Sequence, residues 1–167
     1  MATIPDARWG TSDGPLARLA TRIASTRAGS WTIRTLMPLD RKILLRTEGR
    51  RTLLGPIGAP TLLLETTGRR SGLPRTSPLL FARDGDAVIV VGSNFGQQHH
   101  PAWTANLLAA PTATVIAGGR RVPVHATLLE GEEAESAYRR MEEVTSVYAV
   151  YRHRTDRAIR VFRLTPV

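Results

Sequence analysis

The chain has 167 residues, 42% of them hydrophobic, which is enough for one domain with a substantial core but too short for two ordinary domains. It holds 23 basic and 14 acidic side chains, and the net charge of +9 favours an anionic partner: nucleic acid, an anionic membrane surface or a polyanionic small molecule. The absence of cysteine excludes disulfide and thiolate chemistry and fits a cytoplasmic protein. No apolar run reaches the roughly 20 residues that span a bilayer.

The N-terminal third holds most of the charge excess, with ten basic and four acidic residues in 1–58. Apolar residues recur at helical spacing from Pro15, and we expect Gly29 to end a first amphipathic helix and Pro38 to end a second that contains Trp31. A third helical segment is predicted at 39–45. This arm either lies on an anionic membrane surface or packs on the core as a lid. We therefore divide the chain into a basic helical arm with a connector, 1–58, and a main part, 59–167, within one structural domain.

The main part is predicted to contain short consecutive strands with helices between them. Asp84-Gly85 and Gly118-Gly119 mark two hairpin turns. Helices are expected after Pro101 and over 130–143, the latter continuing or restarting through two tyrosines. The pattern predicts an α+β domain, a small barrel of about six mainly antiparallel strands with helices packed on it. The expected strands are 61–67, 75–82, 87–93, 113–117, 121–129 and 158–164.

A basic turn between the first two predicted strands is the strongest local signal. Gly68 and Gly72 allow a tight reversal, and Arg69, Arg70 and Arg75 are brought to one end of the hairpin. Guanidinium groups bind phosphate and carboxylate through paired, charge-assisted hydrogen bonds. The turn is therefore either an anion site or a solvated basic loop.

Catalytic motifs of the common kinds are missing from the sequence. His99 and His100 are adjacent, no histidine has a carboxylate at metal-ligand spacing, and we predict no metal site. There is no GxSxG elbow, P-loop or GxGxxG fingerprint. If the protein is an enzyme, a bound cofactor is expected to supply the difficult chemistry.

Three separated motifs resemble those of the deazaflavin-dependent nitroreductase family of actinobacteria. They are TTGRRSGLPRTSPL at 66–79, GSNFGQQHHPAWTANL at 92–107 and YAVYRHRTDRAIRVFRLTP at 148–166, in the same order and spacing. The resemblance covers residues 30–167. It implies a split β-barrel that binds coenzyme F420, an 8-hydroxy-5-deazaflavin joined to a phosphate and an oligoglutamate tail, and an oxidoreductase that passes a hydride from the reduced cofactor to a small acceptor.

The resemblance also implies the cofactor site, motif by motif. The turn would hold the phosphate and the start of the tail, the next strand would run along the ring, and the following loop would bring backbone donors to its polar edge. Trp103 would form a wall, although a core position is the alternative for this residue. The implied residues are Arg69, Arg70, Ser71, Arg75, Thr76, Ser77, Pro78, Leu79, Leu80, Val91, Gly92, Ser93, Asn94, Ala102, Trp103, Asn106 and Tyr148.

Tyr148 and Tyr151 match family positions that line the acceptor pocket, and they are the expected catalytic residues. Each would stack on a flat acceptor or donate a hydrogen bond to it, whereas packing of the last helix is the alternative role. Some members of the family have a tyrosine in place of Thr145 and an aromatic residue in place of Leu80. These departures make a quinone or an enone a better-supported acceptor than a nitro compound.

Two other functions explain part of the same pattern. A split barrel that binds flavin mononucleotide, or one that stores a deazaflavin without catalysis, would share the fold. A nucleic-acid module would share the charge, but such modules interleave exposed aromatics with basic residues, and no nucleic acid is expected here. The expected partners are a small-molecule acceptor and an anionic membrane at the inner face, with a homodimer left open.

Overall fold

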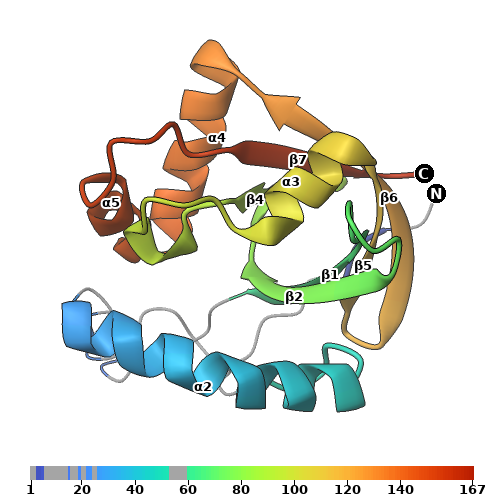
Figure 1. Ribbon diagram of the computed structural model, residues 1–167, viewed down its shortest axis with the longest axis horizontal. Coiled ribbons are helices and arrows are strands. Elements are labelled where there is room, and N and C mark those ends of the chain that lie inside the picture. The colour runs from blue at the N-terminus through green and yellow to red at the C-terminus, as the bar shows by residue number, and fades with distance from the viewer. Residues whose placement is uncertain (1–2, 6–14, 16–18, 20–21, 24–25, 53–59) are drawn as a thin grey trace.

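The computed structural model describes residues 3–5, 15, 19, 22–23, 26–52 and 60–167 (Figure 1). Most of the predicted first helix, and residues 53–59 of the predicted connector, therefore lie outside the described residues. Residues 15, 19, 22 and 23 are helical, in agreement with the predicted helix.

Within the described residues, seven strands form one sheet in which every neighbouring pair is antiparallel. The order across the sheet is β2-β1-β5-β6-β7-β4-β3. The α+β class and the antiparallel barrel predicted from the sequence are confirmed. The strands are β1 (Thr61–Thr67), β2 (Pro74–Leu80), β3 (Ala82–Asp84), β4 (Ala87–Val91), β5 (Thr112–Ala117), β6 (Arg120–Leu129) and β7 (Val161–Pro166).

A single residue joins the two edges of this sheet. β2 and β3 lie at opposite ends of the strand order, yet only Phe81 separates them in the chain. The sheet must therefore curl until its edges meet, which makes it a barrel. Phe81 is buried in the core and its N–H donates to the carbonyl of Pro60 at 3.2 Å. One strand was predicted over 75–82, but the bend at Phe81 divides it in two.

The core has two layers, one inside the barrel and one outside it. Val88 and Val90 of β4 face the interior, and Ile89 and Val91 face a second cluster beneath a helix. Burial on both faces explains why this strand reads as a continuous apolar run. The exact alternation follows from the period of two along a strand.

Helices cover the barrel on several sides (Figure 1). α3 (Ala102–Ala109) contributes Trp103 and Leu107 to the interior cluster, and α4 (Gly131–Val144) covers the second cluster. A short 3-10 turn, η2 (Asn94–Gly96), precedes α3, and α5 (Val147–Arg152) follows α4. The two predicted C-terminal helical segments are confirmed. The last strand begins at Val161 rather than at residue 158.

The N-terminal arm contains one long helix where two separate segments were predicted. α2 (Arg27–Arg46) runs along the bottom of the view in Figure 1, below β2. Gly29 does not end a helix, because it lies in the first turn of α2 and its N–H donates to the N-cap Thr26 at 2.9 Å. Pro38 lies inside the helix and does not break it.

Contacts beyond Pro38 explain why the helix continues. Leu44 is fully buried against Leu63 of β1 and Ile116 of β5. Asp40 is also buried and accepts a hydrogen bond from the hydroxyl of Thr52 at 2.9 Å. Packing of this half on the barrel offsets the hydrogen bond that proline removes. No described helix is long and apolar enough to cross a bilayer.

We expect Leu44→Ala to destabilise the protein and its neighbour Leu45→Ala to have little effect. Leu44 is 0% exposed and Leu45 is 41% exposed, so only the first leaves a cavity between α2 and the sheet. The free energy of unfolding in urea should fall by about 2–5 kcal/mol for Leu44→Ala and by less than about 1 kcal/mol for Leu45→Ala. Equal losses would show that α2 is not anchored at this position.

Candidate functional site

The basic turn between β1 and β2 is a tight reversal closed by backbone hydrogen bonds. The N–H of Gly68 donates to the carbonyl of Leu73 at 2.9 Å, and the N–H of Gly72 donates to the carbonyl of Gly68 at 2.7 Å. Gly72 has a φ of +67°, and a Cβ on Gly68 would lie 2.7 Å from the Ser71 hydroxyl oxygen. One glycine is needed for its conformation and the other for a close approach.

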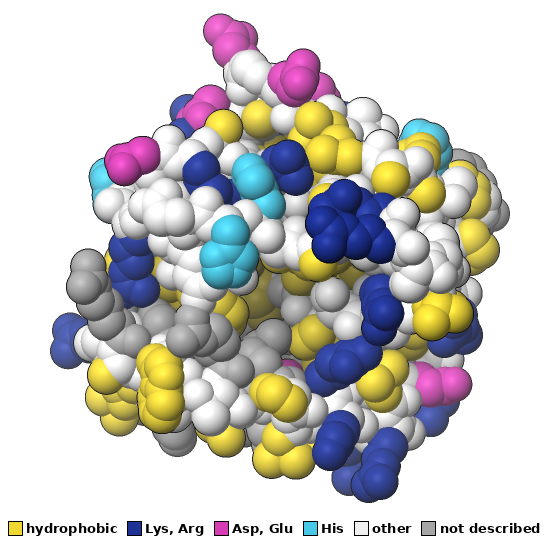
Figure 2. Space-filling view, in the orientation of Figure 1, with side chains coloured by type: hydrophobic (Ala, Val, Ile, Leu, Met, Phe, Trp, Pro, Cys, Tyr) yellow, Lys and Arg dark blue, Asp and Glu magenta, His cyan; other side chains and the backbone are white. Residues whose placement is uncertain are grey.

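Two arginines of this turn and a third at the start of β2 project without a charged partner among the described residues. Arg69, Arg70 and Arg75 are exposed, and none of them forms an ion pair with a described carboxylate. Among the described residues, the guanidinium of Arg75 donates one hydrogen bond, to the hydroxyl of Ser71 at 3.4 Å. Figure 2 shows Lys and Arg side chains gathered along one side of a hollow in this face. Such groups are available to bind phosphate or carboxylate.

Asn106 of α3 fastens the turn to the body of the protein. Its side-chain oxygen accepts from the N–H of Arg69 at 3.1 Å, and its amide nitrogen donates to the hydroxyl of Thr66 at 3.0 Å. Thr66 donates in turn to the carbonyl of Arg75 at 3.3 Å. The buried amide therefore holds both ends of the turn in place, a role that the sequence did not indicate.

Strand β2 offers an open edge next to this turn. It pairs with β1 on one side only, and its last five residues are all half-buried. Leu79 packs on the interior cluster and Leu80 on the second cluster, so the strand runs across the boundary between the two layers. Pro78 has no N–H to donate at this edge. The half-buried residues, all predicted to belong to the site, are Thr76, Ser77, Pro78, Leu79 and Leu80.

The loop from β4 to α3 contains an unusual left-handed turn. Ser93 has right-handed backbone angles, φ −67° and ψ −32°, whereas Asn94, Phe95 and Gly96 have φ values of 48°, 57° and 74°. A right-handed residue followed by a left-handed one turns successive N–H groups toward a common point, and such nests bind anionic or carbonyl oxygens. The N–H groups of Ser93, Asn94 and Phe95 donate to no described acceptor. We call these three N–H groups the nest.

Two predicted donors of the same loop are already engaged in the fold. The N–H of Gly92 donates to the carbonyl of Arg160 at 2.8 Å, and Val91 pairs with Val161 of β7. A Cβ on Gly92 would lie 2.8 Å from the methyl group of Thr104. These two residues therefore fix where the loop leaves the sheet, and the nest begins directly after them.

The structure places Trp103 mainly in the core. Its ring is 5% exposed and lies 5.7 Å from the ring of Phe162, centroid to centroid. Ala102, the residue before it, is exposed at the start of α3. Of the predicted contacts from this helix, Ala102 is therefore the most accessible, whereas Trp103 and Asn106 support the site from within.

Tyr148 and Tyr151 lie side by side on α5, as their spacing predicted. Their ring centroids are 5.9 Å apart in an edge-to-face arrangement, and Phe95 of the loop packs on Tyr151 in the same way at 5.7 Å. The hydroxyl of Tyr138 on α4 donates to the backbone carbonyl of Tyr148 at 2.9 Å. The tyrosine pair is thus connected both to the nest and to α4.

Tyr148 and Tyr151 are both buried, and burial changes the pKa of Tyr148 and of the neighbouring Tyr138. Burial, together with the neighbouring tyrosines, raises the pKa of Tyr148 well above its ordinary value. Burial and the charge of Glu142 raise the pKa of Tyr138 to about 12. Tyr148 therefore remains a neutral hydroxyl at physiological pH, able to donate a hydrogen bond but a weak acid.

Arg157, for which the sequence indicated no role, holds the β4–α3 loop from behind. Its Nε donates to the carbonyl of Gln97 at 2.9 Å, and its Nη2 donates to the carbonyls of Gly92 and Ser93 at 2.9 and 2.8 Å. Its Nη1 lies 3.1 Å from Nδ1 of His100. Burial and the charges of Arg160 and Arg157 lower the pKa of His100, so its neutral ring accepts this bond.

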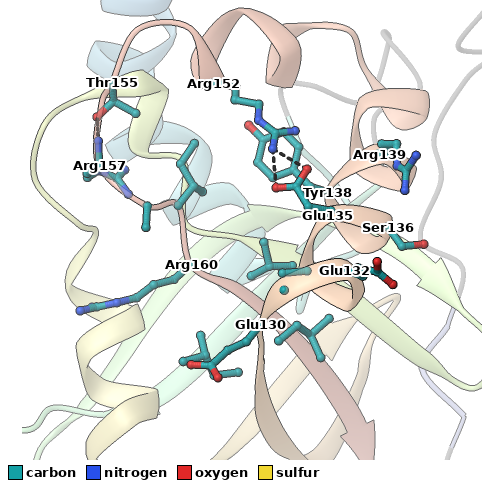
Figure 3. A pocket seen from close by; sticks show the side chains of 17 residues that line it. Glu130, Glu132, Glu135, Ser136, Tyr138, Arg139, Arg152, Thr155, Arg157 and Arg160 are labelled. Atoms are coloured by element: carbon teal, nitrogen blue, oxygen red, sulfur yellow. Dashed lines mark hydrogen bonds and ion pairs between the residues drawn. The ribbon is translucent and has the colours of Figure 1, made fainter.

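A cavity of about 1210 Å³ lies behind this arginine, between α4 and residues 152–161 (Figure 3). An ion pair between Arg152 and Glu135, 2.5 Å long, closes part of its rim. None of the residues predicted for the cofactor or for catalysis lines it. The predicted site residues lie instead on the basic turn, on β2, in the β4–α3 loop and on α3 and α5.

Comparison with known proteins places this arrangement in a family. The profile of "F420H(2)-dependent quinone reductase" matches residues 55–166, which include the whole barrel. An F420H(2)-dependent quinone reductase of Mycobacterium tuberculosis is 36% identical over 135 residues, 78% of this chain and 89% of the relative.

Two solved structures extend the comparison. An F420-H2 dependent reductase is 38% identical, with a TM-score of 0.59 over 63% of this chain and 93% of that one. A protein described as a domain-swapped dimer is 33% identical, with a TM-score of 0.61 over 81% of this chain and 97% of that one.

The tyrosines provide a test of the buried cluster in alkaline solution. The folded protein holds the phenolic protons of Tyr138 and Tyr148 more tightly than the unfolded chain, whose tyrosines titrate near 10.0. The resulting stability is complete below pH 10 and is lost as the pH rises toward 12. We expect phenolate absorbance from these residues to rise only with unfolding, and Tyr138→Phe to weaken the alkaline loss. Phenolate absorbance from Tyr138 or Tyr148 near pH 10 in the folded protein would contradict the burial.

Proposed function

Because the chain belongs to the F420H(2)-dependent quinone reductase family, we propose that coenzyme F420 lies between its basic turn and its β4–α3 loop. The protein is an F420-dependent oxidoreductase built on a split barrel. The residues that hold the cofactor and the acceptor that is reduced are the proposals argued below.

The observation that supports the cofactor site best is the set of unpaired arginines on the basic turn. Arg69, Arg70 and Arg75 have no described carboxylate partner, and they stand at one end of the open strand β2. A phosphate followed by a chain of glutamates matches three such cations better than a single anion would. We assign the phosphate and the start of the tail to these arginines and to Ser71.

The flat ring of the cofactor is assigned to the strand and the loop that follow. The half-buried residues of β2, from Thr76 to Leu80, form one side of the ring site. The nest forms the other side, and its amides suit the carbonyl oxygens at the polar edge of the ring. Val91, Gly92, Trp103 and Asn106 act by shaping this site, and Ala102 is accessible at its border.

When bound, the reduced deazaflavin supplies a hydride. The residues of this chain must then hold an acceptor against the ring and exclude water. Tyr148 and Tyr151 are assigned to this task because their paired rings adjoin the nest through Phe95. A buried neutral hydroxyl can donate a hydrogen bond to the acceptor oxygen that gains charge.

A planar quinone is the acceptor we propose, with enones and nitro compounds as related substrates. The relatives that match are quinone reductases by name. Thr145 precedes the tyrosine pair and Leu80 ends β2, so neither position adds an aromatic ring to the pocket. A site with few aromatic rings favours acceptors that need one flat contact and one hydrogen bond.

Titration of the purified protein with coenzyme F420 and with flavin mononucleotide tests the cofactor. We expect tight binding of the deazaflavin, and Arg75→Ala should weaken it roughly tenfold because a charge-assisted contact to the tail is lost. The rate at saturating cofactor should change little. Arg120→Ala, which removes an exposed charge from the β5–β6 hairpin, is the matched control and should bind normally. Preference for flavin mononucleotide would refute the assignment, and binding without reduction of any quinone would indicate a carrier.

Removal of the Tyr148 hydroxyl tests its catalytic role. Tyr148→Phe should lower quinone turnover by roughly 10- to 100-fold while the cofactor Kd stays within about twofold, since one transition-state hydrogen bond is lost. Tyr138→Phe is the control for stability, because it removes a buried hydrogen bond next to the same residue but no group from the site. Unchanged turnover in Tyr148→Phe would leave only a packing role for this hydroxyl.

We further propose that α2 binds the anionic inner face of a membrane, and that the protein is cytoplasmic and peripheral. Trp31 and Leu39 are exposed on α2, with Lys42 and Arg46 exposed on the same helix. Exposed apolar side chains among basic ones are typical of helices that lie in a lipid interface. In this proposal residues 1–58 form an arm on a barrel domain of residues 59–167.

Vesicle sedimentation tests this surface. The double variant Trp31→Ser with Leu39→Ser should lose most binding to anionic vesicles, whereas Leu108→Ser, at an exposed apolar residue of α3, should keep it. Equal sedimentation of all three proteins would exclude α2 as the contact.

A homodimer is also proposed, because one relative forms a domain-swapped dimer. Light scattering on the same preparations measures the mass of the protein in solution and tests this proposal.

A further inference from the structure

The β4–α3 loop holds a backbone conformation that its own sequence does not favour. Asn94 and Phe95 both have positive φ values, of 48° and 57°, which cost free energy for residues with a Cβ. Within the loop, the Asn94 side chain donates to the carbonyl of His99 at 3.0 Å and to the side-chain oxygen of Gln97 at 3.3 Å. The remaining support must come from other parts of the chain.

Arg157 supplies that support through its whole guanidinium group. Its donors contact the carbonyls of Gly92 and Ser93 before the left-handed turn and the carbonyl of Gln97 after it, at 2.8–2.9 Å. The side chain is half-buried and forms no ion pair with a described carboxylate. Its charge is therefore directed at the loop rather than at an acidic partner.

Peptide geometry connects these contacts to the nest. Each peptide unit is planar and trans, so its carbonyl and its N–H point in opposite directions. The carbonyl of Gly92 shares a peptide unit with the N–H of Ser93, and the carbonyl of Ser93 shares one with the N–H of Asn94. Because Arg157 binds both carbonyls, the N–H groups of Ser93 and Asn94 point away from Arg157, toward the opposite side of the loop.

The segment that presents Arg157 is itself fixed to the loop. Thr155 donates through its hydroxyl to the side-chain oxygen of Gln98 at 3.1 Å and accepts from the N–H of Arg157 at 3.4 Å. A Cβ on Gly96 would lie 2.6 Å from Cβ of Arg154, so the loop and this segment are in close contact. The fork of donors in an arginine can reach three carbonyls at once, whereas a lysine ammonium is a single point.

We infer that Arg157 is a positioning residue for coenzyme F420, which sets the direction of the nest amides without touching the cofactor. The inference rests on the proposed function, since it requires the nest to face the cofactor ring. It adds Arg157, which lies behind the β4–α3 loop, to the residues proposed on the turn and on β2. The role of its guanidinium is to bind the backbone carbonyls of that loop.

The test compares Arg157→Met and Arg157→Lys with the wild type. Arg152→Met is the matched control, because Arg152 lies five residues earlier in the chain but its side chain pairs with Glu135 and makes no described hydrogen bond to the loop. Two readouts are measured: hydrogen exchange of the 92–98 backbone in the protein without cofactor, and the Kd for coenzyme F420 by fluorescence, with the quinone rate at saturation beside it.

Both Arg157 variants should speed exchange of the loop amides and raise the Kd roughly tenfold, since several hydrogen bonds to a charged group are lost. The rate at saturating cofactor should stay within about twofold, because bound cofactor restores the loop. Arg152→Met should match the wild type in both readouts.

The outcomes separate this inference from the function on which it rests. If the wild type binds coenzyme F420 and both Arg157 variants bind it with the same Kd, the inference is overturned and the proposed function stands. Wild-type affinity in Arg157→Lys alone would show that charge suffices, which would overturn the fork geometry. Failure of the wild type to bind the deazaflavin would refute both.

Discussion

Closure of the sheet across Phe81 is the constraint on which the rest of the structure depends. Because one residue joins edge strand β2 to edge strand β3, the sheet curls into a barrel, although the described edges do not pair with each other. The outer edge of β2 therefore has no described strand partner. The large buried ring of Phe81 lies at the bend between the two strands.

The two loops proposed to hold the cofactor are supported in different ways. The basic turn is held by Asn106, whose side-chain amide hydrogen-bonds to Thr66 and to the backbone of Arg69. The nest is held by Arg157, which donates to carbonyls and leaves the amides free. In both cases a polar side chain hydrogen-bonds to the backbone on one side of a loop, and the other side of the loop stays available for a ligand.

The distribution of charge follows the same division. Arginines on the turn lack described acidic partners, whereas Arg140 and Arg163 are paired with acidic residues of β3 and α4, Arg163 with Asp84 at 2.7 Å and with Glu133 at 2.6 Å. Paired arginines join β3, β7 and α4, and they contribute little attraction to a distant anion. The net charge of +9 is thus less informative than the places where basic side chains remain without partners.

Sequence alone determined the features that depend on neighbouring residues. Gly85, Gly118 and Gly119 adopt positive φ values at the hairpin turns that they predicted, β4 is buried on both faces as its apolar run required, and the arginine turn is present with the family motifs around it. These outcomes depend on local backbone preference and on the period of side chains along a strand, both of which can be read from a short stretch of chain.

The tertiary structure decided what depends on residues far apart in the chain. Pro38 remains inside one helix because Leu44 packs on β1 and β5, and the predicted strand at 75–82 is divided because the barrel closes at Phe81. Asn106 holds the turn from within, and Arg157 orients a loop about sixty residues earlier in the chain, its contact to the Gln97 carbonyl spanning 60 positions. No local pattern encodes such contacts, because the energy of a buried hydrogen bond depends on which distant groups folding brings within reach.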